Sequence, residues 1–344
     1  MTSALVPSSQ TQPSAGKPSA GELVSLAESG SRTEGAQHLP RIITDAGDKA
    51  LLSFVNYFTA EIPNENTRRA YLQAWRQFGK WAEGRGVRLD QVKPFMLAAY
   101  REELLKRYHV RSVKQHLSAL RRLFDQMVID QVIPLNPAAT VRGPKFSAKQ
   151  GVTPILSEEE IRKLFNALDT SHVVGLRDRA ILSVLVFAVA RVGAVTTMQV
   201  RDFFPQGRRW KVRLHEKGGK LHEVWCHHNL EENLHAYIEA AGIGEEKTTT
   251  LFRSTVGKTK KLTGSGLDRR NVYDMIRRRS QEAGIAAKIG CHSFRATGIT
   301  LYMENGGSIN EAQKLANHAD PRTTKLYDRS GDSVSLDEIE RIRF

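Results

Sequence analysis

Four side chains that suit phosphoryl chemistry lie in one short stretch, residues 291–328. His292 and Arg295 are three positions apart, and His318 and Tyr327 follow. An arginine guanidinium is always charged and bonds in a plane to phosphate oxygens. A tyrosine hydroxyl can attack phosphorus and hold a covalent intermediate. The stretch therefore indicates attack on a phosphodiester.

Three local elements are needed to bring these side chains together. His292 and Arg295 begin a helical pattern, and their spacing puts them on one helix face. The glycines at 306–307 end that helix, and a second helical pattern covers 309–315. A turn at 317–321 then presents the second histidine ahead of the tyrosine.

The order of these residues resembles the C-terminal signature of the tyrosine recombinases, also called the phage integrase family. In that signature a His-x-x-Arg helix precedes a histidine in a tight turn, and the nucleophilic tyrosine follows. His292, Arg295, His318 and Tyr327 match this order, with His318 nine positions before Tyr327. A His-x-x-Arg pair alone is common on solvated helices, so the resemblance depends on the whole set. It spans about residues 45–344.

A further arginine follows a long apolar pattern. Residues 178–189 predict a buried helix that leads to Arg191. An arginine at that place is costly unless an anion pairs with it, and the alternative is a structural arginine paired with a carboxylate. The resemblance implies that Arg191 is the first catalytic arginine. Ala194 stands where the family has an acid, which weakens the support for this arginine, and Asn317 stands where it usually has glycine.

Alternating residues at 210–214 and 221–225, joined by a Gly-Gly tip, predict a β-hairpin. In the family a lysine on this hairpin reaches the scissile site. Lys217 matches that position and Lys220 is the reserve, while the ordinary reading of both is an exposed hairpin lysine.

The resemblance implies a mechanism. Tyr327 forms a 3′-phosphotyrosyl link and releases a 5′-hydroxyl, while the two arginines stabilise charge on the phosphoryl oxygens. His292 takes the phenol proton, His318 binds a phosphoryl oxygen, and Lys217 protonates the leaving oxygen. We expect no metal and no other cofactor, because arginines supply the positive charge and the covalent link keeps the bond energy.

Composition agrees with a nucleic-acid partner. The chain has 51 basic and 37 acidic residues in 344, a net charge of +14, which favours a polyanion. Cys226 and Cys291 are far apart, and we expect no disulfide, signal peptide or membrane span. The chain is thus expected to be cytoplasmic and nucleoid-associated. Four histidines lie near Cys226 in the sequence: His215, His222, His227 and His228. A zinc site is a less favoured interpretation of them than ordinary surface or strand histidines.

The fold class predicted is mainly α with a small β-sheet. An all-α, SAM-like core-binding domain precedes an α+β catalytic domain, and the resemblance implies a C-shaped clamp on DNA. The predicted parts are a disordered arm at 1–41, a helical DNA-binding domain at 42–143, a linker at 144–153, a catalytic domain at 154–330, and a tail helix at 331–344.

Basic side chains along the first domain suggest a DNA face. Arg111, Lys114 and Arg121 fall on one helix side, opposite the apolar stripe, and a solvated face is the alternative. The full set of predicted DNA contacts is Arg68, Arg111, Lys114, Arg121, Lys145 and Arg270.

The tail after residue 330 is amphipathic, with Leu336, Ile339 and Ile342 on one side. The resemblance implies that it docks on a neighbouring protomer in a homotetramer on DNA, and packing on its own domain is the alternative. The function expected is site-specific recombination of double-stranded DNA, as in integration, excision or resolution of a mobile element, with accessory DNA-bending proteins as further candidates for partners. The alternatives are a type IB topoisomerase and a catalytically silent DNA-binding regulator.

Overall fold

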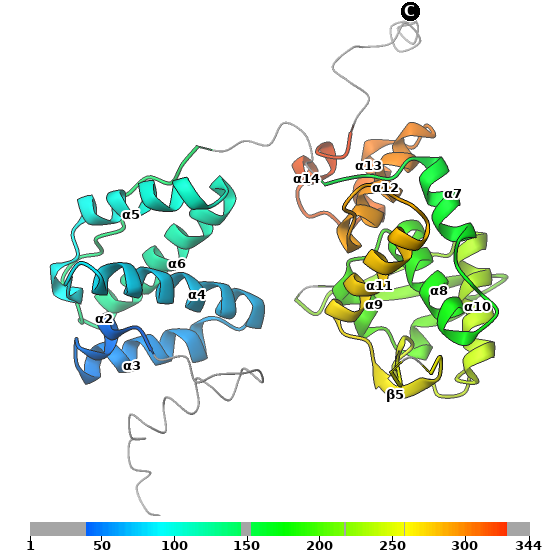
Figure 1. Ribbon diagram of the computed structural model, residues 1–344, viewed down its shortest axis with the longest axis horizontal. Coiled ribbons are helices and arrows are strands. Elements are labelled where there is room, and N and C mark those ends of the chain that lie inside the picture. Colours follow the sequence, from blue (N-terminus) through cyan, green and yellow to red (C-terminus); the bar gives the residue numbers. More distant parts are fainter. Residues whose placement is uncertain (1–38, 146–152, 217, 258, 329–344) are drawn as a thin grey trace, which may run out of the picture. The chain divides into compact units, whose positions relative to one another are not determined.

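The computed structural model describes residues 39–145, 153–216, 218–257 and 259–328. The chain forms two compact units that divide between Ser147 and Ala148 (Figure 1). Both units are mainly helical, and the strands that the structure describes belong to the second unit. The predicted tail lies outside the described residues, as does most of the predicted arm.

The first unit is entirely helical in its described part. Its elements are α2 (Arg41–Thr44), α3 (Asp48–Asn56), a π-helical turn (Tyr57–Glu61), α4 (Glu65–Glu83), a 3-10 turn (Leu89–Gln91), α5 (Pro94–Arg107) and α6 (Val110–Ile129). The sequence explains their ends: Asn64 caps α4 by accepting a hydrogen bond from the Thr67 amide, and Pro94 opens α5. The first described helix, α2, begins at Arg41 and buries Ile42 and Ile43.

An aromatic cluster forms the core of the first unit. Trp75 on α4 is fully buried and meets Phe54, Phe78 and Phe124 edge-on, at ring-centroid distances of 6.3, 5.7 and 5.0 Å. Its indole N–H donates to the carbonyl of Ala119 at 3.1 Å, so burial leaves no polar group unpaired on this ring. Apolar side chains at helical spacing predict helices α3 to α6, and the stripes of α3, α4 and α6 converge on one tryptophan.

The second unit combines helices with two small antiparallel sheets. Its helices are α7 (Glu158–Asn166), α8 (Val173–Phe187), α9 (Val192–Thr197), α10 (His228–Ala241), α11 (Arg269–Glu282), α12 (Cys291–Glu304), α13 (Ile309–Leu315) and α14 (Pro321–Lys325), with a 3-10 turn at Val200–Asp202. Its strands are β1 (Phe203–Gln206), β2 (Arg209–His215), β3 (Leu221–Trp225), β4 (Arg253–Thr255) and β5 (Leu262–Gly266). None of the described helices is both long and apolar enough to span a bilayer.

Helix α8 is the buried centre of this unit and packs against α10 and α12. At Gly298 the backbone of α12 comes so close to α8 that an added Cβ would lie 2.2 Å from the carbonyl oxygen of Val186. Only glycine allows this approach. It holds the helix that carries His292 and Arg295 against the helix that leads to Arg191.

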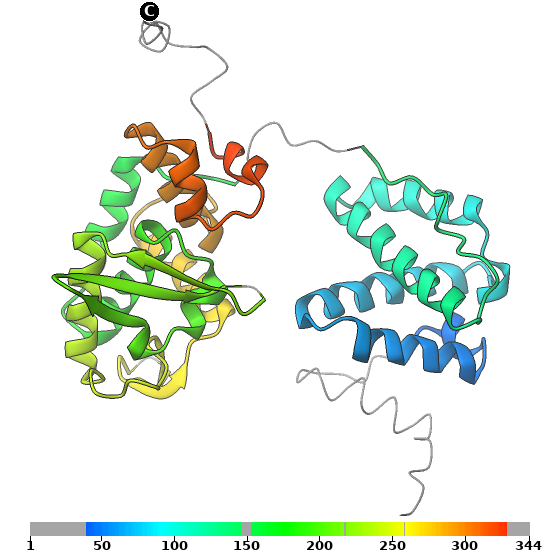
Figure 2. The same cartoon turned by 180° about the vertical axis from the view of Figure 1, so that it is seen from behind.

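The predicted hairpin exists, with a third strand that the sequence analysis missed. Strands β1, β2 and β3 form one antiparallel sheet in that order, with Val212 opposite Val224 (Figure 2). β1 is only four residues long and contains a proline, so its pattern was too short to indicate a strand. The β4–β5 pair was missed as well, because its sequence is rich in Gly, Ser and Thr.

Two helix ends differ from the predictions. The helix predicted over 178–189 ends at Phe187, before the left-handed residue Val189 with φ 41°. The spacing of Asn229 and Glu232 predicts a helix cap at Asn229, but α10 begins at His228 and is capped by His227, whose Nδ1 accepts from the Asn229 amide. A histidine ring nitrogen therefore caps this helix, where the side chain of an asparagine was expected to do so.

A buried ion pair ties α11 to α8. The Asp178 carboxylate is fully buried and accepts from Arg177 at 2.7 Å and from Arg279 at 2.7 Å. Arg279 is one of three consecutive arginines, and it points inward while Arg278 is half exposed. The guanidinium of Arg279 therefore stabilises the packing of α11 against α8 and is not available for binding at the surface.

Replacing Gly298 with valine should lower the free energy of unfolding by about 1–3 kcal/mol, because the α8–α12 contact cannot admit a side chain. The matched control is Gly264→Ala in the same unit, where an added Cβ meets nothing within 4 Å. Thermal unfolding of both variants is the measurement. Equal melting temperatures for the two variants would contradict this packing argument.

Candidate active site

The Tyr327 hydroxyl meets a histidine from another part of the chain. Its oxygen lies 2.9 Å from Nε2 of His292, in the first turn of α12. Tyr327 follows α14 and is 8% exposed, and its backbone carbonyl accepts from the Thr300 hydroxyl at 3.3 Å. The predicted nucleophile therefore points into the unit, toward the group predicted to accept its proton.

The guanidinium of Arg295 is buried between two backbone carbonyls. Arg295 is 2% exposed, and its two terminal nitrogens donate to the carbonyls of Val189 and Ala316. Burial, followed by the nearby charge of Arg191, lowers its pKa to about 10, so the side chain remains charged at neutral pH. The carbonyl of Val189 faces it because that residue adopts a left-handed backbone, which is strained for a β-branched side chain.

Arg191 stands at the N-cap of α9 and pairs with the carboxylate of Glu216. Its side chain is 41% exposed, whereas that of Glu216 is 5% exposed. Its charge lowers the pKa of Arg295, His318 and Tyr327, so it lies near them. Arg191 therefore has the carboxylate partner of the structural reading, and its catalytic role stays a prediction.

His318 lies against the tyrosine ring. The two rings are stacked at a centroid distance of 5.8 Å and an angle of 13°, and Nδ1 of His318 is 2.9 Å from the Thr324 hydroxyl. Burial and the charges of Arg295 and Arg191 lower the pKa of His318 to about 4. The preceding Asn317 has φ 46°, as expected where a related turn would use glycine, and asparagine tolerates this backbone.

The protonation states of Tyr327 and His292 suit proton transfer from the phenol to the imidazole. Burial raises the pKa of the Tyr327 hydroxyl, although both arginines oppose the shift. Burial, then Arg295 and Arg191, lowers the pKa of His292, so its imidazole is neutral at neutral pH. A neutral imidazole can accept through Nε2, the nitrogen that faces the phenol. The pair is therefore a phenol next to a base.

Five of the six predicted catalytic residues are thus brought together, from the N-cap of α9, from α12, from the loop after α13 and from the residues after α14. Lys217 lies outside the described residues, between β2 and β3 in the sequence. The reserve, Lys220, is exposed beside that tip, where its carbonyl accepts from the Glu216 amide at 2.7 Å.

Three residues that support the site were not singled out by the sequence analysis. Glu216 and Thr324 contact the catalytic side chains, and Val189 turns its carbonyl toward Arg295. Thr324 and Val189 carry no sequence signal, because a threonine in a helix and a valine at the end of an apolar run are commonplace. Glu216 did carry a sequence signal, because it is an acidic residue next to the predicted catalytic lysine, Lys217, in a basic chain.

Of the four histidines near Cys226, His227 and His228 lie side by side with ring centroids 4.0 Å apart, and the other two have different partners. His215 pairs with Asp202 at 3.0 Å, His222 bonds the Leu315 carbonyl at 3.0 Å, and His227 stacks on Phe187. In the part of the chain that the structure describes, no three His, Cys, Asp or Glu side chains are grouped to hold a metal ion.

The predicted DNA contacts divide into two groups. Arg68 donates to the Ile62 carbonyl at 2.9 Å, and Arg121 donates to the Val141 carbonyl at 2.9 Å, so both guanidiniums support their own unit. The other four side chains are exposed: Arg111, Lys114, Lys145 and Arg270.

Family comparisons agree with this geometry. The model of the phage integrase family matches residues 154–333, and that of its N-terminal SAM-like domain matches residues 52–129. The chain belongs to the phage integrase family. Its members are site-specific DNA recombinases that transfer strands through a tyrosine, and this recombinase has their two-domain, mainly helical organisation.

Individual relatives extend over most of the recombinase. Tyrosine recombinase XerD of Pseudomonas aeruginosa is 28% identical over 267 residues, which is 76% of this chain and 86% of XerD. Tyrosine recombinase XerC of Leptospira interrogans is 25% identical over 306 residues, 88% of this chain and 94% of XerC.

Solved structures show the same fold. The XerH recombinase bound to its palindromic difH substrate, in a post-cleavage complex, has a TM-score of 0.66 and 19% identity, covering 90% of each chain. A lambda integrase dimer bound to a COC′ core site has a TM-score of 0.63 and 19% identity, covering 88% of this chain and 85% of the integrase.

His318 is expected to stay neutral down to about pH 4 in the folded protein, because burial and two arginines disfavour its charged form. Its ordinary pKa is 6.5, so the unfolded chain binds more protons between those two values. The contribution of this group to stability therefore falls as pH drops through that window. An NMR titration of the ring, assigned with His318→Gln, should show no midpoint above pH 5, and a midpoint near 6.5 would contradict the burial.

Proposed function

We propose that this recombinase cuts double-stranded DNA by attack of the Tyr327 hydroxyl on a phosphodiester, giving a 3′-phosphotyrosyl link and a free 5′-hydroxyl. The contact between that hydroxyl and Nε2 of His292, beside two arginines, is the observation that carries the proposal. The hydroxyl of another strand then attacks the link, displaces the tyrosine and rejoins the DNA. The cleavage and rejoining steps conserve atoms and charge. They need no added energy source, because the phosphotyrosyl link keeps the energy of the broken bond.

Each described catalytic group has a role that fits its state. His292 takes the phenol proton as the new P–O bond forms. Arg191 and Arg295 stabilise the charge that develops on the phosphoryl oxygens. If Nδ1 of His318 accepts from Thr324, its Nε2–H is free to donate to one of those oxygens. Lys217 is assigned to protonate the leaving 5′-oxygen, by position on the hairpin alone.

The buried guanidinium of Arg295 suits this role although carbonyls already contact it. Each terminal nitrogen carries two N–H groups, and each carbonyl uses one, so further donors remain. The Nε of this side chain is also buried without a partner among the described residues. A phosphate would satisfy donors that the protein leaves open.

The alternatives are less well supported. A catalytically silent regulator would have no use for a hydroxyl held against a neutral base and two guanidiniums. A type IB topoisomerase shares the chemistry, but the matched relatives are recombinases along most of this chain. We therefore propose site-specific recombination in the cytoplasm, in integration, excision or resolution of a mobile element, with accessory DNA-bending proteins as further partners.

DNA contact is assigned to the exposed cations of both units. Arg111 and Lys114 on α6, Lys145 and Arg270 reach solvent, where they can neutralise phosphates, and Arg270 also pairs with Asp274 at 2.8 Å. We propose that both units contact DNA through these side chains.

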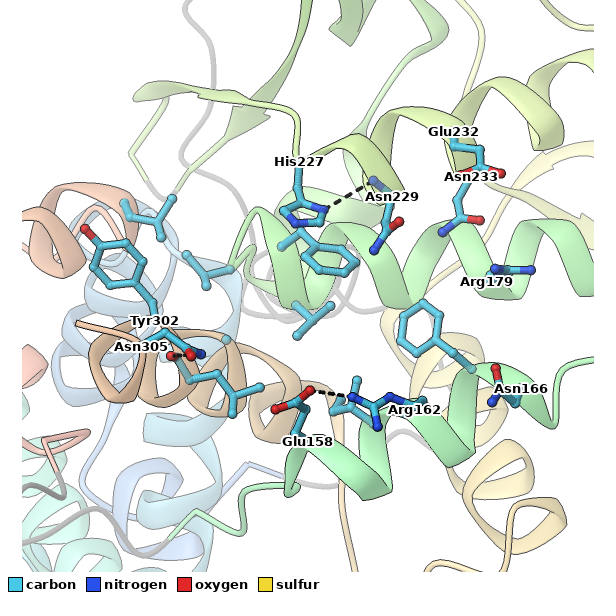
Figure 3. Close-up of a pocket in the computed structure, with 18 residues that line it drawn as sticks. Glu158, Arg162, Asn166, Arg179, His227, Asn229, Glu232, Asn233, Tyr302 and Asn305 are labelled. Carbon is cyan, nitrogen blue, oxygen red and sulfur yellow. Dashed lines mark hydrogen bonds and ion pairs between the residues drawn. The ribbon is translucent and has the colours of Figure 1, made fainter. Parts of the chain in front are cut away.

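A pocket in the second unit suits the predicted tail. Its volume is about 590 Å³, and helices α7, α8, α10 and α12 enclose it (Figure 3). Val186, Phe187, Leu301 and Leu315 make its wall apolar, and both signs of charge stand on the rim, among them Glu158 and Arg162. The tail offers three apolar side chains at helical spacing, flanked by Asp, Glu and Arg. We propose that the tail of one protomer fills the pocket of the next in a homotetramer on DNA.

Replacing Tyr327 with phenylalanine should abolish the covalent protein–DNA complex and leave the dissociation constant for DNA within about twofold, because only the nucleophilic oxygen is lost. The assay uses nicked duplexes made from the DNA that flanks its own coding sequence, so that the cut strand diffuses away. The matched control is Tyr273→Phe, an exposed tyrosine of the same unit on α11, which should form the complex at the normal rate. Covalent product from the Tyr327 variant would overturn the assignment.

Two substitutions that change the charge of the tail test this proposal. Ile339→Asp places a charge on the apolar side of the tail and should abolish tetramers on DNA, whereas Arg341→Asp alters the polar side and should not. Analytical ultracentrifugation of protein with its DNA site gives the stoichiometry. Normal tetramers with Ile339→Asp, or loss of monomer stability instead of assembly, would reject docking between protomers.

A further inference from the structure

The carboxylate of Glu216 is the buried anion of the active site. It follows β2 directly, its side chain is 5% exposed, and one oxygen accepts from a terminal nitrogen of Arg191. The other oxygen, Oε1, is buried and has no hydrogen-bond partner among the described residues. Its backbone amide donates to the Lys220 carbonyl at 2.7 Å, so the hairpin fixes where the carboxylate lies.

This anion acts on both arginines. Besides the direct ion pair with Arg191, the charge of Glu216 raises the pKa of Arg295 against the lowering by burial. A carboxylate in such a place is costly unless cations are close, so the fold retains it together with the guanidiniums. The neighbouring position 194, in the first turn of α9, holds an alanine that is 3% exposed and offers no polar atom.

We propose that Glu216 is a positioning residue for strand cleavage: its carboxylate holds the Arg191 guanidinium in the orientation that meets the scissile phosphate, in place of the acid missing at position 194. The inference rests on the proposed function of the site. The guanidinium is pinned on one side by a buried group, while 41% of its side chain is exposed and available to DNA. An arginine has five N–H donors, and the carboxylate occupies few of them.

A competing reading is that the carboxylate occupies the place of the phosphate and must leave before DNA binds. The burial of Glu216 argues against it, because its side chain is only 5% exposed directly after β2, and a phosphate would have to enter a place from which solvent is already excluded. The two readings predict opposite effects of removing the charge. Loss of an obstructing anion would speed cleavage, and loss of a positioning anion would slow it.

The experiment compares Glu216→Gln, Glu216→Asp and Glu223→Gln on the nicked duplex. Glu223 is the matched control, because it is a carboxylate on the same sheet that pairs with Arg213 at 3.0 Å, away from the site. Glu216→Gln should lower the single-turnover rate of covalent complex formation by about 10- to 100-fold while DNA binds as tightly as before or more tightly. Glu216→Asp should restore part of the rate, and Glu223→Gln should stay within about twofold.

A double-mutant cycle with Arg191→Ala distinguishes positioning of the Arg191 guanidinium from general damage to the fold. If Glu216 acts through Arg191, then Glu216→Gln should cost little further rate in the Arg191→Ala background. An unchanged or faster rate for Glu216→Gln, an equal loss for Glu223→Gln, or full additivity in the cycle would overturn the inference. These outcomes leave the proposed function intact, since that function fails only if the unaltered protein forms no Tyr327-linked DNA.

Discussion

A guanidinium that must stay charged while buried is the constraint on which the active site depends. Arg295 is enclosed, and the carbonyls of Val189 and Ala316, together with the charge of Glu216, compensate its burial. Those carbonyls come from the ends of two different helices, α8 and α13. The helices must therefore end where they do, and the left-handed backbone at Val189 is a local cost of that arrangement.

The same constraint sets the protonation of its neighbours. Burial, followed by the charges of the two arginines, lowers the pKa of both histidines and keeps them neutral, and the same two charges oppose the rise in the tyrosine pKa. The site is thus organised to receive negative charge, with a phenol and a base already in contact. The glycine contact between α8 and α12 gives this arrangement a rigid base, and Val189 also lines the apolar pocket on the other side of the same helix end.

Sequence reasoning predicted the side chains that the structure brings together and missed those that contact them. His292, Arg295, His318 and Tyr327 were found because phosphoryl transfer restricts the residue types and their order. Helices α4, α5 and α6 were found because their apolar stripes are long. The end of α8 and the cap of α10 were placed wrongly because tertiary contacts decide helix ends. Glu216 was passed over because a carboxylate partner of Arg191 could come from anywhere in the chain, and only the fold brings the hairpin to it.

The central claim is that two guanidiniums, far apart in sequence, compensate the charge of one scissile phosphate. A direct test is to replace the scissile phosphate with a methylphosphonate, which lacks one charged oxygen, and to measure cleavage by the unaltered protein and by Arg295→Ala. The account predicts that the alanine variant loses about 10²–10³-fold in rate on the phosphate and far less on the methylphosphonate. An equal loss on both substrates would contradict it, because the arginine would then serve the fold and not the charge.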